Sequence, residues 1–415
     1  MQVKRFLGFA LLGVSTLLVA SCGGSSSDES SSKTTTTAKV AVTTPEPTCE
    51  SSVPYESGTG GYDTYRIPAT VATDKGTVLA FAEGRRDSSA DHGSIDTLVR
   101  RSSDGGCNWE PVQVVTSGVG ENRNNPAVVF DPKTKRVIVL TLVRSEKATE
   151  LQIRSGQAIG ADGMRVFQQE STDDGETFSE PKEITDQTKE AHWRWNVVGP
   201  GHGVVLTKGD HAGRIVFGAN HSVPPAEGST DNPMADKFLA AHSIYSDDNG
   251  ETWQVGFIQE NTDGVINGNE TTAAELADGR VYFNTRNQNG SAEVNRAGAF
   301  SDDGGKTLVA PFTSTESLAQ IPVIEASLLQ LRGDDAPLLL SAPSVPTARE
   351  AMTIFASTDG AKTWSVALKI SDAPAAYSDL VQLDDDTIGL LYETGEASEN
   401  ETITFLRVPV SSLTR

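Results

Sequence analysis

The sequence has little cysteine, little positive charge, and no long apolar run after residue 21. Three cysteines in 415 residues exclude a small, disulfide-dense scaffold. Lys and Arg number 34 against 56 Asp and Glu, which gives a formal net charge of −22. Such an acidic chain repels phosphate backbones and anionic lipid, so we expect no nucleic-acid partner. Any acidic small substrate must therefore be held by local arginines.

The N-terminal residues are typical of a targeting segment. Two basic residues precede an apolar stretch over residues 6–20, which is short for a membrane span. The Val-Ala-Ser-Cys that follows resembles a bacterial lipobox and predicts a signal peptide over residues 1–21 with lipidation of Cys22. An ordinary secretory cleavage site is the alternative. Residues 22–48, rich in Ser and Thr, are then a flexible tether. We expect an exported lipoprotein of the outer membrane or cell surface, attached to the membrane only through this anchor.

The state of the two remaining cysteines, Cys49 and Cys107, is open. An even pair in an exported chain favours a disulfide. Two free thiols buried in the core are the alternative, and the sequence does not decide between them.

Residues 49–415 contain a repeated turn motif, Ser-x-Asp-x-Gly-x-Thr/Asn-aromatic, which we call the Asp-box. Its copies begin at Ser102, Ser171, Ser246, Ser301 and Ser357. Leu308 replaces the aromatic residue of the fourth copy, and Ala361 replaces the glycine of the fifth. The aspartate is expected to bind backbone amides, and the glycine to take a positive φ. Copies about 55 to 75 residues apart, among short alternating apolar runs, predict an all-β fold, a six-bladed β-propeller with one blade lacking the motif.

The stretch TYRIPAT, residues 64–70, places an arginine among apolar neighbours. Those neighbours predict a strand that Pro68 ends. Together with the Asp-boxes, the stretch resembles the sialidase (neuraminidase) family of propeller glycosidases, over nearly the whole chain from about residue 50. Three arginines hold the carboxylate of sialic acid in that family, and planar guanidinium groups suit this task. The resemblance assigns the role to Arg66, Arg286 and Arg349.

The resemblance also implies the reacting groups. Most glycosidases use two carboxylates, whereas sialidases use a tyrosine nucleophile. The carbon under attack already bears a carboxylate, which would repel a second one. Tyr377 matches the nucleophile, and Glu270 matches the partner that takes its proton. Glu393 matches the glutamate that orients Arg66.

A polar segment, AEGRRDSSADHGSID, supplies the candidate acid. Asp91 matches the acid/base aspartate of the family, and Asp87 and Asp96 on the same segment are alternatives. Glu83 and Arg85 match neighbouring positions of the substrate pocket. An ion pair within the segment is the alternative for these two residues.

Trp193 and Trp195 match a segment near the active-site rim of bacterial relatives, where we expect contact with the sugar. Nucleotide-binding loops and metal-ligand spacings are missing from the sequence, so we expect neither a cofactor nor a metal. The resemblance therefore implies a retaining exo-α-sialidase that releases terminal sialic acid from glycans. A trans-sialidase and a sialic-acid-binding lectin without catalysis are the alternatives. Because a lectin need not keep Asp91, Glu270 and Tyr377, their presence favours the enzyme.

Overall fold

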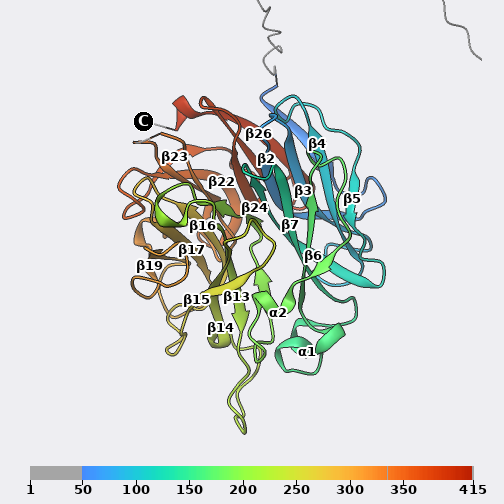
Figure 1. Cartoon of the computed structure of the whole chain (residues 1–415), viewed down its shortest axis with the longest axis vertical. Coiled ribbons are helices and arrows are strands. Elements are labelled where there is room, and N and C mark those ends of the chain that lie inside the picture. Colours follow the sequence, from blue (N-terminus) through green and yellow to red (C-terminus); the bar gives the residue numbers. More distant parts are fainter. Residues whose placement is uncertain (1–48, 334, 414–415) are drawn as a thin grey trace, which may run out of the picture. The chain divides into compact units, whose positions relative to one another are not determined.

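The computed structural model describes residues 49–333 and 335–413, and this part of the chain consists mainly of antiparallel β-strands (Figure 1). Two short helices, α1 (Glu150–Arg154) and α2 (Thr185–Thr188), lie in connections between strands. The 3₁₀ turns are Gly160–Asp162, Gly209–His211, Asp236–Phe238, Glu316–Leu318 and Val410–Ser412. No helix among the described residues is long and apolar enough to cross a membrane. The predicted signal peptide, Cys22 and the predicted tether lie outside the described residues.

The described strands form five hydrogen-bonded sheets. One sheet contains β24 (Ala375–Gln382), β25 (Thr387–Thr394), β26 (Thr402–Pro409) and β1 (Ser51–Glu56). The largest contains β2 (Thr64–Ala72), β3 (Val78–Arg85), β4 (Ile95–Ser102), β5 (Gln113–Thr116), β6 (Glu121–Asp131), β7 (Arg136–Ser145), β8 (Arg165–Ser171), β9 (Lys182–Glu183) and β11 (Gly201–His202). A third contains β10 (Asn196–Val198), β12 (Val204–Val205), β13 (Ile215–Ser222), β14 (Leu239–Ser246) and β15 (Gln254–Ile258). The fourth contains β16 (Gly268–Glu275), β17 (Val281–Asn287), β18 (Arg296–Ser301) and β19 (Thr313–Ser314). The fifth contains β20 (Ser327–Gln330), β21 (Leu338–Val345), β22 (Ala348–Ser357) and β23 (Ser365–Lys369).

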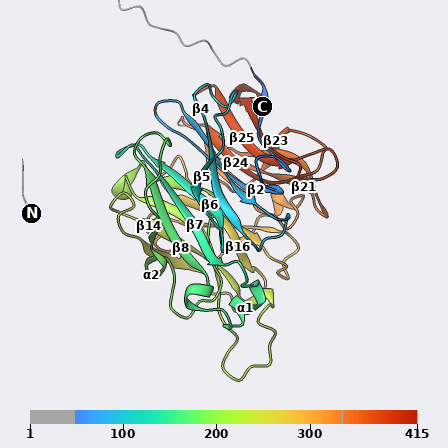
Figure 2. The ribbon, with the colours of Figure 1, turned by 90° about the vertical axis from the view of Figure 1, so that its right-hand side faces the viewer.

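The sheets are arranged as a propeller, so the predicted all-β propeller fold is confirmed. The first strand, β1, pairs with β26 and completes the sheet that the last three strands begin. The blue β2 consequently lies beside the red β24 and β25 (Figure 2). The nine-stranded sheet contains two four-stranded runs, β2 to β5 and β6 to β9, joined by one parallel bridge between Ile95 and Asn122. The prediction of six blades depends on counting these two runs separately.

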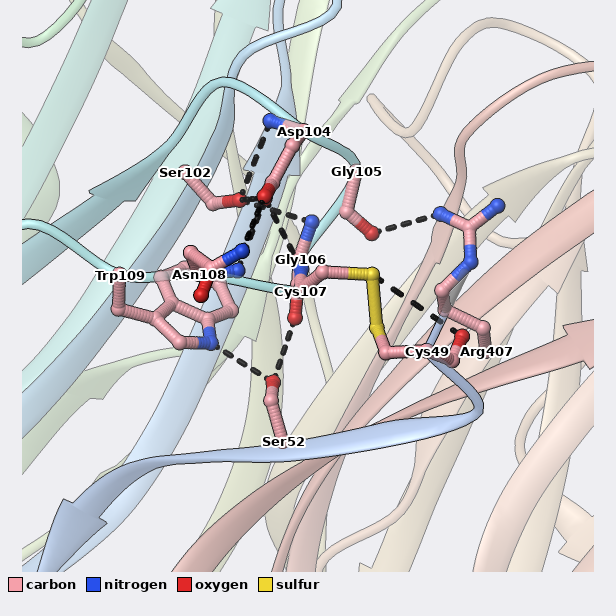
Figure 3. Close-up of a disulfide and its surroundings, with 10 residues drawn as sticks. All are labelled: Cys49, Ser52, Ser102, Asp104, Gly105, Gly106, Cys107, Asn108, Trp109 and Arg407. Carbon is pink, nitrogen blue, oxygen red and sulfur yellow. Dashed lines mark hydrogen bonds between the residues drawn. A yellow bond between two sulfur atoms is a disulfide. The ribbon is translucent and has the colours of Figure 1, made fainter. Parts of the chain in front are cut away.

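The Asp-box turns are alike in their hydrogen bonds. In the first copy, the Ser102 hydroxyl donates to Asp104, and the Gly106 N–H donates to Ser102 at 2.8 Å (Figure 3). The serine–aspartate bond recurs at 2.7 or 2.8 Å in the other four copies. A disulfide between Cys49 and Cys107 joins the first copy to the chain just before β1. Of the two states that the sequence left open, the structure has the disulfide.

Strand β2 does not end at Pro68. It continues to Ala72, and its register against β3 shifts between Arg66 and Ala69. Ile67 has a φ of +55°, a strained value for a β-branched residue. A bulge of this kind accommodates a proline, which cannot donate to the strand ladder. The prediction that Pro68 ends the strand is therefore wrong, because the proline lies in a bulge beside Arg66.

The core lies where neighbouring sheets pack together. Leu140 of β7 and Ile215 of β13 belong to one buried cluster, and Val216 of β13 and Phe283 of β17 belong to another. Such contacts fix each sheet against the next. They also fix the strand ends, from which the site residues project.

Candidate active site

Arg66 is buried at the bulge in β2 and is held by Glu393 of β25. Its Nε donates to Glu393 Oε1 at 2.7 Å, and the Ile67 N–H donates to the same oxygen at 2.7 Å. The other oxygen of Glu393 accepts from the Tyr377 N–H at 3.1 Å. Although burial lowers the pKa of Arg66, the Glu393 carboxylate raises it above the usual value. The guanidinium is therefore charged and fixed in orientation.

Tyr377, Glu270 and Arg286 form one hydrogen-bonded group. The Tyr377 hydroxyl donates to Glu270 Oε1, and Arg286 Nη1 donates to Glu270 Oε2 at 2.9 Å. Arg286 Nη1 also donates to the Tyr377 hydroxyl oxygen at 3.3 Å. Tyr377 lies near the start of β24, Glu270 near the start of β16, and Arg286 near the end of β17. Two separate sheets thus bring together residues far apart in the sequence.

The Tyr377 hydroxyl keeps its proton in the free protein. Burial and the Glu270 carboxylate raise the pKa of Tyr377 well above its usual value, against the opposing charges of Arg286 and Arg66. The neutral hydroxyl already donates to a carboxylate that can accept the proton. A tyrosine nucleophile requires such a base beside it.

Three arginines surround Tyr377 with donors that are not used. The guanidinium carbons of Arg66 and Arg349 lie 5.3 Å and 5.9 Å from the centre of its ring. Nη1 and Nη2 of Arg66, and the whole guanidinium of Arg349, make no hydrogen bond to a described residue. Arg286 bonds through Nη1, and its Nη2 makes no hydrogen bond to a described residue. Unused guanidinium donors gathered at one point form a site for a planar anion such as a carboxylate.

Asp91 lies in the loop between β3 and β4, with Oδ1 2.8 Å from Arg85 Nη1. Arg85 and Glu83 are buried in β3, where Arg85 Nε and Nη2 donate to Glu83 at 2.9 Å and 2.7 Å. The Asp91 side chain is 81% exposed. Partial loss of hydration raises its pKa, but Arg85 and then Arg66 lower it by more, so the pKa of Asp91 is below its usual value. Asp91 is therefore ionised in the free protein at neutral pH.

The two alternatives to Asp91 differ in their surroundings. Asp96 is buried in β4 and accepts hydrogen bonds from the Tyr62 hydroxyl at 2.6 Å and the Gly118 N–H at 2.7 Å, and it also pairs with Arg86. These bonds give Asp96 a structural role. Asp87 is exposed and makes no side-chain hydrogen bond to a described residue, so it stays an alternative.

Sequence reasoning missed two residues of this region. Arg144, near the end of β7, donates through Nη2 to the backbone carbonyl of Asp91 and so holds the loop. Glu325 is buried, and its Oε2 accepts from the Ser378 N–H at 3.1 Å. Burial and the nearby Glu270 carboxylate raise the pKa of Glu325 well above its usual value. A lone glutamate in the apolar stretch IPVIEASLL was the one signal for it, whereas Arg144 had none.

The expected contact of Trp193 with the sugar is wrong, because its side chain is 1% exposed. Its indole stacks on His221 at 3.7 Å between ring centres. Trp195 is half-buried, and its ring lies 5.5 Å from the Arg144 guanidinium carbon. The residues that the structure describes contain no cluster of His, Cys, Asp or Glu arranged to hold a metal ion.

The chain is similar to known sialidases over most of its length. The profile of the BNR repeat-like domain family matches residues 76–392. A sialidase of Micromonospora viridifaciens is 32% identical over 356 residues, which are 82% of this chain and 51% of the relative. An exo-alpha-sialidase of Aspergillus fumigatus is 30% identical over 375 residues, which are 80% of this chain and 79% of the relative.

The fold is also that of a solved sialidase. The Hadza microbial sialidase Hz136 superposes with a TM-score of 0.71 and 26% identity, over 85% of this chain and 67% of that one. The chain spans about half the length of the Micromonospora relative. From the BNR repeat-like profile and the length shared with the fungal relative, we conclude that the chain belongs to the sialidase family.

Proposed function

We propose that the chain is a retaining exo-α-sialidase, built on a six-bladed propeller, that releases terminal sialic acid from glycans. The observation that carries the proposal is the hydroxyl of Tyr377, which donates to Glu270 amid three guanidinium groups with unused donors. The arginines suit the carboxylate of the sugar. Tyr377 is a neutral nucleophile that this carboxylate does not repel.

In each step of the proposed reaction, Glu270 or Asp91 accepts or donates the proton that is transferred. Glu270 accepts the phenol proton as the Tyr377 oxygen bonds to the anomeric carbon. The bond from this carbon to the aglycone oxygen breaks, and Asp91 gives that oxygen a proton. Water then attacks the carbon while Asp91 takes its proton. The bond to Tyr377 breaks, and Glu270 returns the proton to the phenol oxygen. Two displacements at one carbon retain its configuration.

Asp91 must be protonated in the first step, although Arg85 lowers its pKa in the free protein. The substrate carboxylate adds a negative charge near Arg66, and a bound aglycone removes water from the loop. Both effects raise the pKa of a carboxyl group. We therefore expect turnover of poor leaving groups to increase as the pH falls toward protonation of Asp91.

The experiment measures the first step for the full chain, as pre-steady-state release of lactose from sialyl-lactose and of phenol from an aryl sialoside, because Asp91 also acts in the second step on both substrates. Asp91→Ala should lose about 10²–10⁴-fold on sialyl-lactose and much less on the aryl sialoside, whose phenol leaves without a proton. Asp87→Ala is the matched control. Equal losses on both substrates for Asp91→Ala would exclude it as the acid, and a selective loss for Asp87→Ala would assign the role there.

The anomeric form of the first product tests retention. Proton NMR during turnover should show α-sialic acid before it equilibrates. A first product in the β form would contradict the tyrosine mechanism. An anhydro sugar, or sialic acid joined to a second acceptor, would assign the chain to the trans-sialidases, and binding without turnover would make it a lectin.

We also propose that Cys22 carries a lipid anchor on an exported chain. The apolar stretch and the lipobox-like sequence before Cys22 support this proposal. Cys22→Ala should leave the membrane fraction and keep its specific activity. A variant that stays with the membranes would exclude the anchor.

A further inference from the structure

A cavity of about 370 Å³ lies outside the tyrosine site, since none of its lining residues belongs to that site. The chain before β8 and the segment around α2 form its walls. Its charged lining residues are Arg165, Glu183, Asp186, Lys189 and Arg194. Neither the fold nor the proposed reaction requires a cavity here.

Lys189 and Arg194 are two cations of this cavity that lack counter-charges. Among the described residues, neither forms an ion pair, and Arg194 Nε is buried without a hydrogen-bond partner. Burial, and after it the nearby positive charge of Arg194, lower the pKa of Lys189 below its usual value. Two adjacent like charges in a partly buried place destabilise the fold unless an anion joins them.

The other charges of the cavity do not remove this imbalance. Arg165 is paired with Glu121 at 3.0 Å. Glu183 is exposed and accepts from the Thr185 hydroxyl at 2.8 Å, and Asp186 is exposed. Neither carboxylate lies within ion-pair distance of Lys189 or Arg194 in the described part of the chain.

The cavity is connected to the loop that carries Asp91 through two side chains that do not line it. Trp195, next to Arg194 in the sequence, lies against the Arg144 guanidinium, and Arg144 donates to the Asp91 carbonyl. The Ser94 hydroxyl of the same loop donates to Glu146 at 2.9 Å, just after β7. Arg194 of the cavity is thus joined to the loop of the proposed acid through Trp195 and Arg144.

We propose that this cavity binds a second acidic group of the substrate, carried by the aglycone. The ligand is an oxyanion, either the carboxylate of a second sialic acid or a sulfate ester on a neighbouring sugar. Arg194 supplies a planar donor pair and Lys189 a point charge. In a chain of net charge −22, such a local site allows a doubly acidic glycan to bind despite the repulsive field. The proposal rests on the proposed sialidase function.

The experiment compares kcat/KM for three substrates: sialyl-lactose, disialyl-lactose and a sulfated sialyl-lactose. Lys189→Gln/Arg194→Gln should lose about tenfold or more on an acidic aglycone, as expected for lost charge-assisted hydrogen bonds. Its rate on sialyl-lactose should stay within about twofold, because both residues lie outside the tyrosine site. A loss for disialyl-lactose alone assigns a carboxylate ligand, and a loss for the sulfated glycan alone assigns a sulfate.

The matched control is Lys135→Gln/Lys237→Gln, which removes two exposed cations that pair with Asp74 and Asp231. It changes the net charge equally and should affect all three substrates alike. Equal losses in both double variants, or no selective loss in Lys189→Gln/Arg194→Gln, would overturn the proposal. If the wild-type chain releases no sialic acid, the proposed function fails. Calorimetric binding of disialyl-lactose and sialyl-lactose to the same variants then tests the cavity without turnover.

Discussion

The Asp-box turns and the tyrosine site are both built from hydrogen-bonded polar side chains, but they differ in how far apart the partners lie in the sequence. In the second Asp-box, Ser171 bonds to Asp173 and Gly175, two and four residues away. In the site, Arg66 and Glu393 are 327 residues apart, and Tyr377 and Glu270 are 107 apart. The turns are therefore local structures that recur, whereas the site exists only when the propeller has closed.

This difference predicts two separable kinds of damage. A change in one Asp-box should lower stability and leave the chemistry intact. A change in the tyrosine site should stop the chemistry and leave the fold intact, because the surrounding sheets hold the strand ends. The variants below test this separation.

The largest expected effect is that of Tyr377→Phe. The ring stays between the arginines, but the attacking oxygen and its bond to Glu270 are lost. We expect kcat to fall at least about 10³-fold on both sialyl-lactose and an aryl sialoside, since removal of a nucleophile affects every leaving group. Steady-state kinetics and thermal unfolding should show an inactive protein with a melting temperature near that of the wild type. A rate within tenfold of the wild type would refute the tyrosine mechanism.

A smaller loss is expected for Arg66→Lys. Lysine keeps the charge near Glu393 but lacks the planar pair of nitrogens that a carboxylate accepts. We expect kcat/KM to fall about 10- to 100-fold, the effect of losing hydrogen bonds to a charged group. Arg66 could also have a structural role, because its buried ion pair with Glu393 connects β2 with β25. An unchanged affinity for a sialic-acid analogue, with lower stability, would place Arg66 among the structural residues.

The sequence predicted the Asp-box turns, whose partners are close in the sequence, better than the tyrosine site, whose partners are far apart. All five Asp-boxes were evident because each one carries its own hydrogen-bond partners. The group around Tyr377 could be matched only through a resemblance, since no local pattern joins residues 107 positions apart. The bulge at Pro68 and the burial of Trp193 were mispredicted, because contacts with other strands determine both.

Asp248→Ala tests the structural side of the comparison. Asp248 accepts from the Ser246 hydroxyl at 2.8 Å, the Thr252 N–H at 2.8 Å and the Thr252 hydroxyl at 2.6 Å. Loss of these bonds should lower the free energy of unfolding by about 1–3 kcal/mol, with kcat unchanged. Burial raises the pKa of Asp248, but the hydrogen bonds from Thr252 lower it by more, so the pKa is below its usual value. The loss of stability in Asp248→Ala should therefore be complete above the ordinary pKa of aspartate. It should shrink as the pH falls through the pKa of Asp248 in the folded protein. A fall in kcat would show that the two regions are coupled.

The smallest effect is expected for Ala361→Gly, in the Asp-box where alanine replaces glycine. Ala361 has a φ of +66°, a value that costs an L-residue about 1–2 kcal/mol. Glycine removes that strain. It also gives up a buried methyl group, which contributes about 0.8 kcal/mol, and adds about 0.4–1 kcal/mol of chain entropy to the unfolded state. The terms nearly cancel, so denaturant unfolding should show a change of less than about 1 kcal/mol.

Gly250→Ala is the matched contrast to this change. Gly250 has a φ of +88°, and a Cβ there would lie 2.5 Å from Ile138 Cδ1. The same backbone strain would appear, and the terminal methyl of Ile138 would have to move, so overpacking should add about 1 kcal/mol of destabilisation. Changes in the free energy of unfolding that are equal in size and opposite in sign at positions 250 and 361 would contradict this account. The backbone angle alone would then determine the residue at this turn, and packing from the adjacent sheet would have no part in it.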